Sequence, residues 1–472
     1  MHRITSRREF LKNSVYATGG AAIGLAAINQ VAPAIWKMRV PLEPNDSYWA
    51  QGRPPPNPPL TSDLDVDVAV VGGGFTGLSS AWFIRRASPH KSVAVLEAQY
   101  CGSGASGRNG AMVLTNTADR YMNFSADPLM DKRIYELTVQ NIALLVALGQ
   151  QTGIDCEWQT EGALQVLGTA EDRKAAQEYV RQARQIGIPV EYWESPQIKR
   201  AIGTAAYEAA FFDPNCGQVH PMKLVSAWKA TAAAAGVAVY EDTVVQHVEE
   251  GRTHVLSTSG GHTVRARSLV LATNAFTPNL GFLRNAILPV QEYVAITTPL
   301  SATALAQAGW RQPIPFNDSR TEVYYLGLTP DRRIHIGGGA PRYAFNSAGP
   351  DPSSKRSHET QLRQELSRLY PSLSNVAFER SWHGVIDWSL DAAPSVGVTG
   401  RNNNVYFGIG YSGHGVNLTS LFGRIIADLE AGKSDPWAQY PFVNNRLYYV
   451  PNEPFRWLAA KAGLAWYGLV GS

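Results

Sequence analysis

The chain has 472 residues, of which 44% are hydrophobic and 17% are charged. This composition excludes a disordered chain, and the length favours two interleaved domains over one compact core. The formal net charge of +3 belongs to residues 1–34, and the remaining acidic and basic residues balance. The sequence therefore predicts no nucleic-acid partner.

The N-terminus has the pattern of an export signal. The pair Arg7-Arg8 precedes the block Phe10–Lys12, an apolar Gly/Ala-rich run follows over about residues 15–28, and a small-x-small pattern ends it at 32–34. These features resemble a bacterial twin-arginine signal peptide, which sends a folded protein to the periplasm. The alternative is an uncleaved membrane anchor, although the apolar run is shorter than the roughly 20 residues of a good spanning helix.

Residues 35–63 are rich in proline and predict an extended linker. A βαβ unit is expected next, with a strand over Val66–Val71, a helix over Phe75–Arg86 and a strand over Ser92–Glu97. Between the first strand and the helix, residues 72–77 read Gly-Gly-Gly-Phe-Thr-Gly. This is a GxGxxG motif in the context that a dinucleotide-binding unit requires.

Each part of the motif has a physical role in binding a dinucleotide. Gly72 allows the tight turn, Gly74 lets a pyrophosphate approach the backbone, and Gly77 lets the helix pack closely on the strand. The N–H groups of the helix N-terminus then face the phosphates. Glu97 stands 20 residues after Gly77, where a carboxylate can accept hydrogen bonds from ribose hydroxyls and disfavours NADP. The alternative is a glycine-rich turn in another α/β protein.

The rest of the chain alternates helical and strand patterns. Helical periodicity covers residues 130–150, 170–187, 230–235 and 359–370. Short strands are expected at 237–240, 244–248, 254–257 and 269–272. Longer stretches of strand-forming residues, which suit an antiparallel sheet, lie at 291–298, 322–328 and 332–337. A strand at 405–408 leads into a helix from about residue 416 to 430.

Two loops of small residues favour FAD over NAD. Residues 102–110 read Gly-Ser-Gly-Ala-Ser-Gly-Arg-Asn-Gly, and such a loop can wrap a diphosphate and ribityl chain with backbone donors. Residues 408–415 read Gly-Ile-Gly-Tyr-Ser-Gly-His-Gly and join a strand to a helix. Backbone N–H groups at that helix start could stabilise negative charge at N1–C2=O of the flavin.

On these motifs the sequence resembles the FAD-dependent oxidoreductases of the D-amino-acid-oxidase superfamily. The resemblance rests on GASGRNG at 104–110, the block 272–275, the run 382–397 and GIGYSGHGV at 408–416, in the family's order, and it spans about residues 65–470. Within the superfamily the sequence is most similar to gamma-glutamylputrescine oxidase-like enzymes.

The fold that the resemblance implies is α/β, with a Rossmann-like FAD-binding domain interleaved with an antiparallel-sheet substrate domain (α+β). We expect residues 64–115, 215–285 and 380–435 in the FAD-binding domain. We expect residues 116–214 and 286–379 in the substrate domain, and an apolar C-terminal tail over 436–472.

The resemblance also implies which residues hold FAD: Gly72, Gly74, Phe75, Thr76, Gly77, Glu97, Ala98, Gly104, Ala105, Ser106, Arg108, Asn109, Gly110, Ala111, Val245, Ala272, Thr273, Gly410, Gly413, His414 and Gly415. Ala111 stands where these oxidases often have a further glycine. Relatives with a covalently attached flavin carry a histidine near Arg108, and none is present here, so non-covalent FAD is expected.

The implied reaction is oxidation of the C–N bond of an amine or amino acid. Hydride transfer to flavin N5 gives an imine, which then hydrolyses. Oxygen, a quinone or a cytochrome remains open as the electron acceptor. The alternatives are a quinone- or cytochrome-linked dehydrogenase and a flavin electron-transfer subunit without an amine site of its own.

Candidate catalytic residues lie on the predicted antiparallel sheet: His335, Tyr325 and Tyr293, with Tyr324 and Gln291 beside them and His383 near the flavin edge. His335 precedes Gly337 at the place where the similar sarcosine oxidases carry an oxygen-activating lysine. For each candidate the alternative is a packed structural residue.

One departure from the family bears on the substrate. Relatives often have Tyr-Arg before Leu-Thr-Pro-Asp, and that arginine can pair with a substrate carboxylate. Here residues 328–331 follow Tyr325-Leu326-Gly327, so the arginine is missing. Arg320 and Arg342 are candidates to replace it, but the departure favours an amine over a simple α-amino acid.

Two expectations concern the cysteines and the C-terminus. Cys101, Cys156 and Cys216 match no metal motif, so no metal site is predicted, and pairing of Cys156 with Cys216 stays open. The aromatic segment 454–470 is expected to pack on the protein's own surface, and weak membrane association through it is the alternative.

Overall fold

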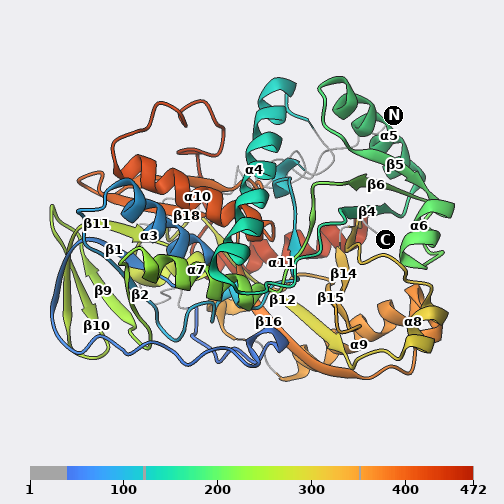
Figure 1. The fold of residues 1–472 in the computed structure, drawn as a ribbon, viewed down its shortest axis with the longest axis horizontal. Coiled ribbons are helices and arrows are strands. Elements are labelled where there is room, and N and C mark those ends of the chain that lie inside the picture. The colour runs from blue at the N-terminus through green and yellow to red at the C-terminus, as the bar shows by residue number, and fades with distance from the viewer. Residues whose placement is uncertain (1–39, 121–123, 321, 350–351, 471–472) are drawn as a thin grey trace.

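The computed structural model describes residues 40–120, 124–320, 322–349 and 352–470, with only the backbone of 463–470. The predicted signal peptide lies outside the described residues. Two eight-stranded sheets occupy opposite ends of the molecule (Figure 1). A third, small sheet pairs β3 (Met112–Val113) with β7 (Gly217–Gln218).

The first sheet carries the predicted βαβ unit, which is confirmed. Its strand order is β17-β18-β11-β1-β2-β8, and all neighbours are parallel except β17 and β18. This corresponds to the order of a Rossmann-like unit. Its strands are β1 (Leu64–Val71), β2 (Val93–Leu96), β8 (Ala238–Tyr240), β11 (Thr263–Leu271), β17 (Ser395–Thr399) and β18 (Val405–Ile409), and β9 (Val245–Glu249) and β10 (His254–Thr258) join it through β11.

Helices cover this sheet because its strands are apolar on both faces. Val68, Ala69 and Val70 in β1 have no exposed surface, as expected for a parallel strand between two layers. Helix α3 (Phe75–Ala87) packs against both α7 (Pro221–Ala234) and α10 (Gly415–Glu430). The long helix α4 (Pro128–Thr152) packs in turn on α7 and α10 and contributes to the same hydrophobic core.

The second sheet has the order β16-β12-β15-β14-β13-β4-β6-β5, and all pairs are antiparallel except β13 with β4. Its strands are β4 (Ala163–Leu167), β5 (Glu191–Glu194), β6 (Ala209–Asp213), β12 (Leu288–Thr297), β13 (Phe316–Asp318), β14 (Tyr324–Leu328), β15 (Ile334–Gly338) and β16 (Phe378–Trp388). The associated helices are α5 (Ala170–Gln185), α6 (Ser195–Ile202), α8 (Ala302–Ala308) and α9 (Pro352–Leu369). The predicted α/β fold class, with an antiparallel second unit, is confirmed.

One boundary needs correction. The sequence prediction placed residues from 380 onward with the first sheet, but β16 pairs with β12 along almost its whole length in the second sheet. Polar residues and Gly384 interrupt the hydrophobic alternation of β16, which hid this strand. The consequence is that the end of β16 runs from the second sheet toward the loop that precedes α10, where Asp387 meets Tyr411.

The described part of the proline-rich segment contacts the body of the protein over residues 40–50, whereas Pro54, Pro55 and Pro56 are exposed and lie outside any helix or strand. Residues 40–50, which we call the strap, pack on the body of the protein, and Val40 and Trp49 are at most 2% exposed. The Trp49 Nε1–H donates to the Asn109 carbonyl at 2.9 Å, and Lys355 Nζ lies 3.0 Å from Asp46 Oδ2. Proline content indicates an extended backbone but says nothing about what that backbone contacts.

The C-terminal tail contacts the body up to about residue 456, whereas Leu458 in the helix that follows is 52% exposed. Trp437, Phe442 and Val450 are buried, and Arg456 donates to backbone carbonyls of Arg284 and Pro451. Helix α11 (Phe455–Val470) follows. Within the part of the chain that the structure describes, no helix is long and apolar enough to cross a bilayer.

Cys101, Cys156 and Cys216 are buried free cysteines, so no disulfide bond joins Cys156 and Cys216.

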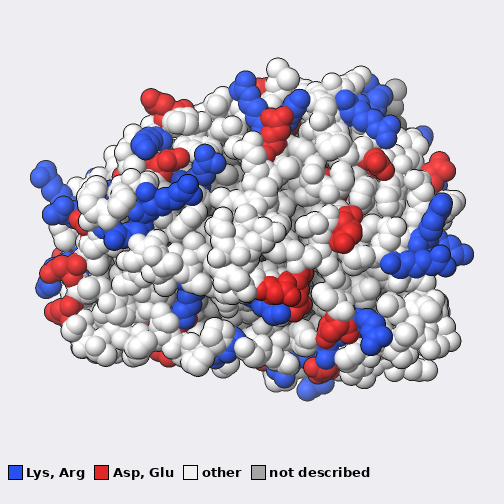
Figure 2. Space-filling view, viewed as in Figure 1, with Lys and Arg blue, Asp and Glu red and all other residues white. Residues whose placement is uncertain are grey.

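On the face shown in Figure 2, acidic and basic side chains are interspersed and separated by wide uncharged areas.

Candidate cofactor and active site

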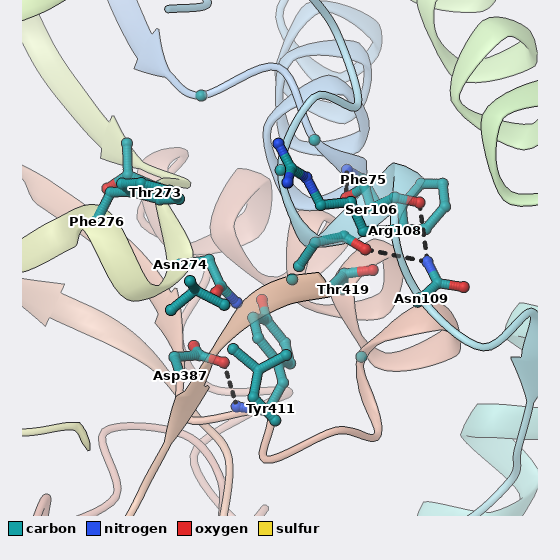
Figure 3. Close-up of a pocket in the computed structure, with 18 of the residues that line it drawn as sticks. Phe75, Ser106, Arg108, Asn109, Thr273, Asn274, Phe276, Asp387, Tyr411 and Thr419 are labelled. Atoms are coloured by element: carbon teal, nitrogen blue, oxygen red, sulfur yellow. Dashed lines mark hydrogen bonds between the residues drawn. The ribbon is translucent and has the colours of Figure 1, made fainter. Parts of the chain in front are cut away.

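A cavity of about 370 Å³ lies between the two sheets, at the carboxyl ends of β1, β2 and β11. This is the edge where ligands bind in open α/β sheets. Figure 3 shows ten labelled side chains from several distant segments of the chain around this pocket. The second sheet contributes its own wall through Glu292, Val294, Asn317, Val323 and Tyr325.

The glycine motif has the geometry that its spacing predicts. Gly72 has φ +106°, and a Cβ atom there would lie 2.5 Å from the Ala272 carbonyl oxygen. A Cβ atom at Gly77 would lie 1.9 Å from the Gly72 carbonyl oxygen, so only glycine permits this contact between helix and strand. The N-cap residue of α3 is Gly74, which has no side chain that could cap the helix. Ser106 Oγ accepts from the N–H of Phe75 at 3.0 Å. The first turn of α3 therefore presents a backbone surface to the cavity, as a phosphate group requires.

Glu97 is fixed at the end of β2 by three donors. Its Oε2 accepts from the Gly73 N–H at 2.6 Å, and its Oε1 accepts from the Gln99 N–H at 3.0 Å and from Ser103 Oγ at 3.1 Å. Burial raises the pKa of Glu97, and these hydrogen bonds act against that rise. The side chain lines the cavity, so it is placed to meet a sugar, and contact with the ribose stays a prediction.

The polar side chains of the 102–110 loop hold the loop itself. Arg108 donates from Nε to the Ser103 carbonyl at 2.7 Å, and from its Nη atoms to the carbonyls of Glu43 at 2.7 Å and His383 at 3.3 Å. Asn109 Nδ2 donates to the Ser106 carbonyl at 2.8 Å. Arg108 thus ties the loop to the strap and to β16.

Most of the predicted cofactor residues line the cavity. They are Gly72, Gly74, Phe75, Thr76, Glu97, Ala98, Gly104, Ala105, Ser106, Arg108, Asn109, Gly110, Val245, Ala272, Thr273, Gly413, His414 and Gly415. Gly77, Ala111 and Gly410 do not line it. Ala111 has φ +63°, a backbone conformation that favours glycine.

Sequence reasoning missed Asp387, which lies at the end of β16. This carboxylate is completely buried, lines the cavity, and accepts from the N–H groups of Gly410 at 2.7 Å and Tyr411 at 3.2 Å. Figure 3 shows Asp387 beside Tyr411 and Asn274. Burial raises the pKa of Asp387 to about 7 against the effect of these donors. Asp387 lies within the run 382–397 that carried the family resemblance, and this was the signal that could have found it.

The three catalytic candidates are not brought together. Tyr325 lines the cavity, and glycines at 110 and 337 make room for its ring. Tyr293 does not line it and stacks on His358 with ring centroids 3.9 Å apart. Neither Tyr324 nor Gln291 lines it.

His335 lies behind the cavity wall rather than in it. It has no exposed surface, its Nε2 is 3.1 Å from Gln218 Oε1, and its ring meets that of Trp49 edge-on. Burial lowers the pKa of His335 to about 3, so the ring is neutral at physiological pH. This placement argues against the proton-holding role that the sequence suggested.

His383 does line the cavity, and it pairs with the strap. Its Nε2 lies 2.6 Å from Glu43 Oε2. Burial lowers the pKa of His383, and the Glu43 carboxylate opposes that effect. Because Glu43 also lines the cavity, the pair forms part of the wall that the strap closes.

Neither proposed replacement for the missing arginine reaches the cavity. Arg320 pairs with Asp318 and Glu365, and Arg342 donates to Ser354 Oγ at 2.9 Å. Among the described residues that line the cavity, Arg108 is the one arginine, and its guanidinium is bound to three carbonyls.

The comparisons with known proteins agree with this site. Residues 67–429 match the model of the DAO family, described as FAD dependent oxidoreductase. The chain is 29% identical over 435 residues to gamma-glutamylputrescine oxidoreductase of Escherichia coli, covering 87% of this chain and 96% of that protein. It is 28% identical over 387 residues to probable oxidoreductase OrdL of Haemophilus influenzae, covering 80% and 86%.

Among solved structures, the glycine oxidase from Geobacillus kaustophilus superposes with a TM-score of 0.68 at 24% identity, covering 81% of this chain and 99% of that chain. The L-proline dehydrogenase from P. horikoshii superposes with a TM-score of 0.67 at 20% identity, covering 81% and 98%. At these identities the likeness establishes the fold.

Proposed function

The chain belongs to the DAO family of FAD-dependent oxidoreductases, and we propose that it oxidises the C–N bond of an amine, which its similarity to gamma-glutamylputrescine oxidoreductase supports. We also propose that the enzyme is exported, which the Arg7-Arg8 pattern at its N-terminus supports. The cavity fits FAD because it offers a glycine turn, a first helical turn without a capping N-cap side chain, and the buried carboxylate of Glu97 at the neighbouring strand end. We propose that FAD is held there without a covalent bond.

The observation that favours an amine over an α-amino acid is the charge of the substrate wall. The second sheet contributes Glu292 from β12 and Asn317 from β13, together with the apolar side chains of Val294 and Val323. A carboxylate attracts an ammonium group, whereas an α-carboxylate would need a cationic partner that Arg108, bound to three carbonyls, is poorly placed to supply.

In this proposal the protein's own groups position the substrate. Tyr325 and the valines confine its carbon skeleton, and Glu292 attracts its nitrogen. The chemistry that FAD supplies when bound is acceptance of a hydride at N5 from the carbon next to that nitrogen. The resulting imine hydrolyses to a carbonyl compound and an amine or ammonia.

Anaerobic reduction of the bound flavin tests the proposal. The purified protein should lose its oxidised-flavin absorbance when mixed with members of a panel of monoamines, diamines and N-methyl amines, and respond less to α-amino acids. Loss of absorbance with amino acids alone would contradict the amine preference. If no member reduces the flavin, the proposal of amine oxidation fails and the alternative of an electron-transfer subunit gains support. Peroxide formation in air then distinguishes an oxidase from a quinone- or cytochrome-linked dehydrogenase.

Replacing Glu292 tests the substrate wall. Glu292→Gln should raise the amine concentration for half-maximal flavin reduction about tenfold, which corresponds to roughly 1.4 kcal/mol for a charge-assisted contact. The matched control is Glu322→Gln, which changes an exposed carboxylate that does not line the cavity. If flavin reduction depends on amine concentration in the same way in the two variants, Glu292 does not contact the substrate.

A further inference from the structure

The loop before α10 has an unusual backbone that needs support. Within four residues, Gly410, Ser412 and Gly413 have φ angles of +76°, +49° and +88°. Ser412 is not a glycine, so its left-handed conformation carries strain that its surroundings must offset. Residues 411–415 all line the cavity. The shape of this loop therefore decides what the cavity presents to the flavin.

Asp387 holds the loop from the side of the second sheet. Its two carboxylate oxygens accept from the N–H groups of Gly410 and Tyr411, and its backbone carbonyl accepts from the N–H of Ser412 at 3.2 Å. On the other side, the Tyr411 hydroxyl lies 2.9 Å from Thr76 Oγ1 in the first turn of α3. Asp387 and Thr76 thus fix the loop between β16 and the glycine motif.

These contacts change the expectation that the loop amides stabilise the flavin. The N–H groups of Gly410 and Tyr411 point to Asp387 and are not available to a cofactor. The start of α10 at Gly415 remains, where the N-cap residue His414 provides no side-chain cap and no acidic residue lies in the first turn. The positive end of the α10 dipole is therefore left to face the cavity.

We infer that Asp387 is a positioning residue that shapes the 410–413 loop so that the N-terminus of α10 is presented to the flavin. A carboxylate suits this role because it accepts on both oxygens, and the two backbone donors reach different oxygens. An amide of the same shape would turn an NH₂ group toward one of these N–H groups. The loop would then lose one hydrogen bond and gain a repulsive contact.

The test is Asp387→Asn, compared with Asp213→Asn as a matched control. Asp213 is also a buried carboxylate with several donors, among them Thr115 Oγ1 at 2.6 Å and Tyr135 Oη at 2.9 Å, but it does not line the cavity. We expect Asp387→Asn to raise the Kd for FAD about tenfold and to alter the visible absorption bands of the bound flavin. Asp213→Asn should lower the melting temperature and leave both flavin properties as in the wild type.

Both readouts are independent of amine oxidation, so this inference can fail while the proposed function stands. A folded Asp387→Asn variant with wild-type FAD Kd and flavin spectrum would overturn it. If that variant does not fold, hydrogen exchange of the wild-type full chain, measured with and without FAD, tests the positioning role of Asp387 instead. Protection of the amides of Gly410 and Tyr411 in both states supports the positioning role, and protection only with FAD overturns it.

Discussion

At the level of single residues, Glu97 shows how a carboxylate can be both structural and ligand-binding. Three protein donors fix its orientation at the cavity wall. We predict that Glu97→Ala weakens FAD binding by roughly 1–3 kcal/mol, the usual loss for a charge-assisted hydrogen bond. Fluorescence titration of FAD-depleted protein measures the change. An unaltered affinity would mean that Glu97 supports the loop and does not meet the ribose.

His335 leads to a prediction about acid stability. In the unfolded chain a histidine has a pKa near 6.5, whereas burial lowers the pKa of His335 to about 3 in the folded protein. The unfolded state therefore binds the proton first, and the free energy of unfolding falls as the pH falls from about 6.5 toward 3, by up to about 1.4 kcal/mol per pH unit. Above pH 6.5 the neutral, buried His335 makes its full contribution to the free energy of unfolding.

His335→Gln should remove this part of the pH dependence. Urea unfolding at pH 7.5, 6 and 5 would show a smaller loss of stability on acidification in the variant than in the wild type. Parallel curves for the two proteins would show that His335 takes up a proton in the folded state, and would restore it as a candidate proton-holding group.

At the level of elements, the strap is the least expected part of the fold. Trp49 anchors it through an indole N–H bond and edge-on contacts to His220, His335 and Trp382. We predict that Trp49→Ala lowers the free energy of unfolding by about 3–5 kcal/mol, as for other large buried aromatic residues, and weakens FAD binding through Asn109. The control Pro55→Ala, at an exposed position of the proline-rich segment outside the strap, should stay within about 0.5 kcal/mol.

The sequence predicted the elements with regular periodicity and missed those set by distant partners. The βαβ unit, α4, α5 and the strands β12, β14 and β15 follow from local hydrophobic patterns and are confirmed. β16 and the strap owe their structure to contacts that no local pattern reveals. The same distinction holds within the candidate site. The spacing of the glycines predicted their positions, whereas the role of Asp387 depends on the contact between β16 and the 410–413 loop, which no local pattern predicts.

At the level of the whole molecule, the proposed export through the twin-arginine route leads to a test in cells. Replacing both Arg7 and Arg8 with lysine should leave flavin-loaded protein in the cytoplasm, because the twin-arginine route carries folded proteins and depends on this pair. Cell fractionation with detection of bound flavin measures the outcome. Normal appearance of the double variant in the periplasm would indicate another route.

The strap also constrains the order in which the molecule is completed. It is the first described segment to be synthesised, and some of its partners lie far along the chain: Val40 bonds to Asn279 across 239 residues, and Asp46 to Lys355 across 309. Contacts of such long range form late, because the intervening chain must be made and ordered first. Until then Pro41, Leu42 and Glu43 cannot close their side of the cavity. The part of the cavity wall that Glu43 and His383 form together is therefore complete only after β16 has been synthesised.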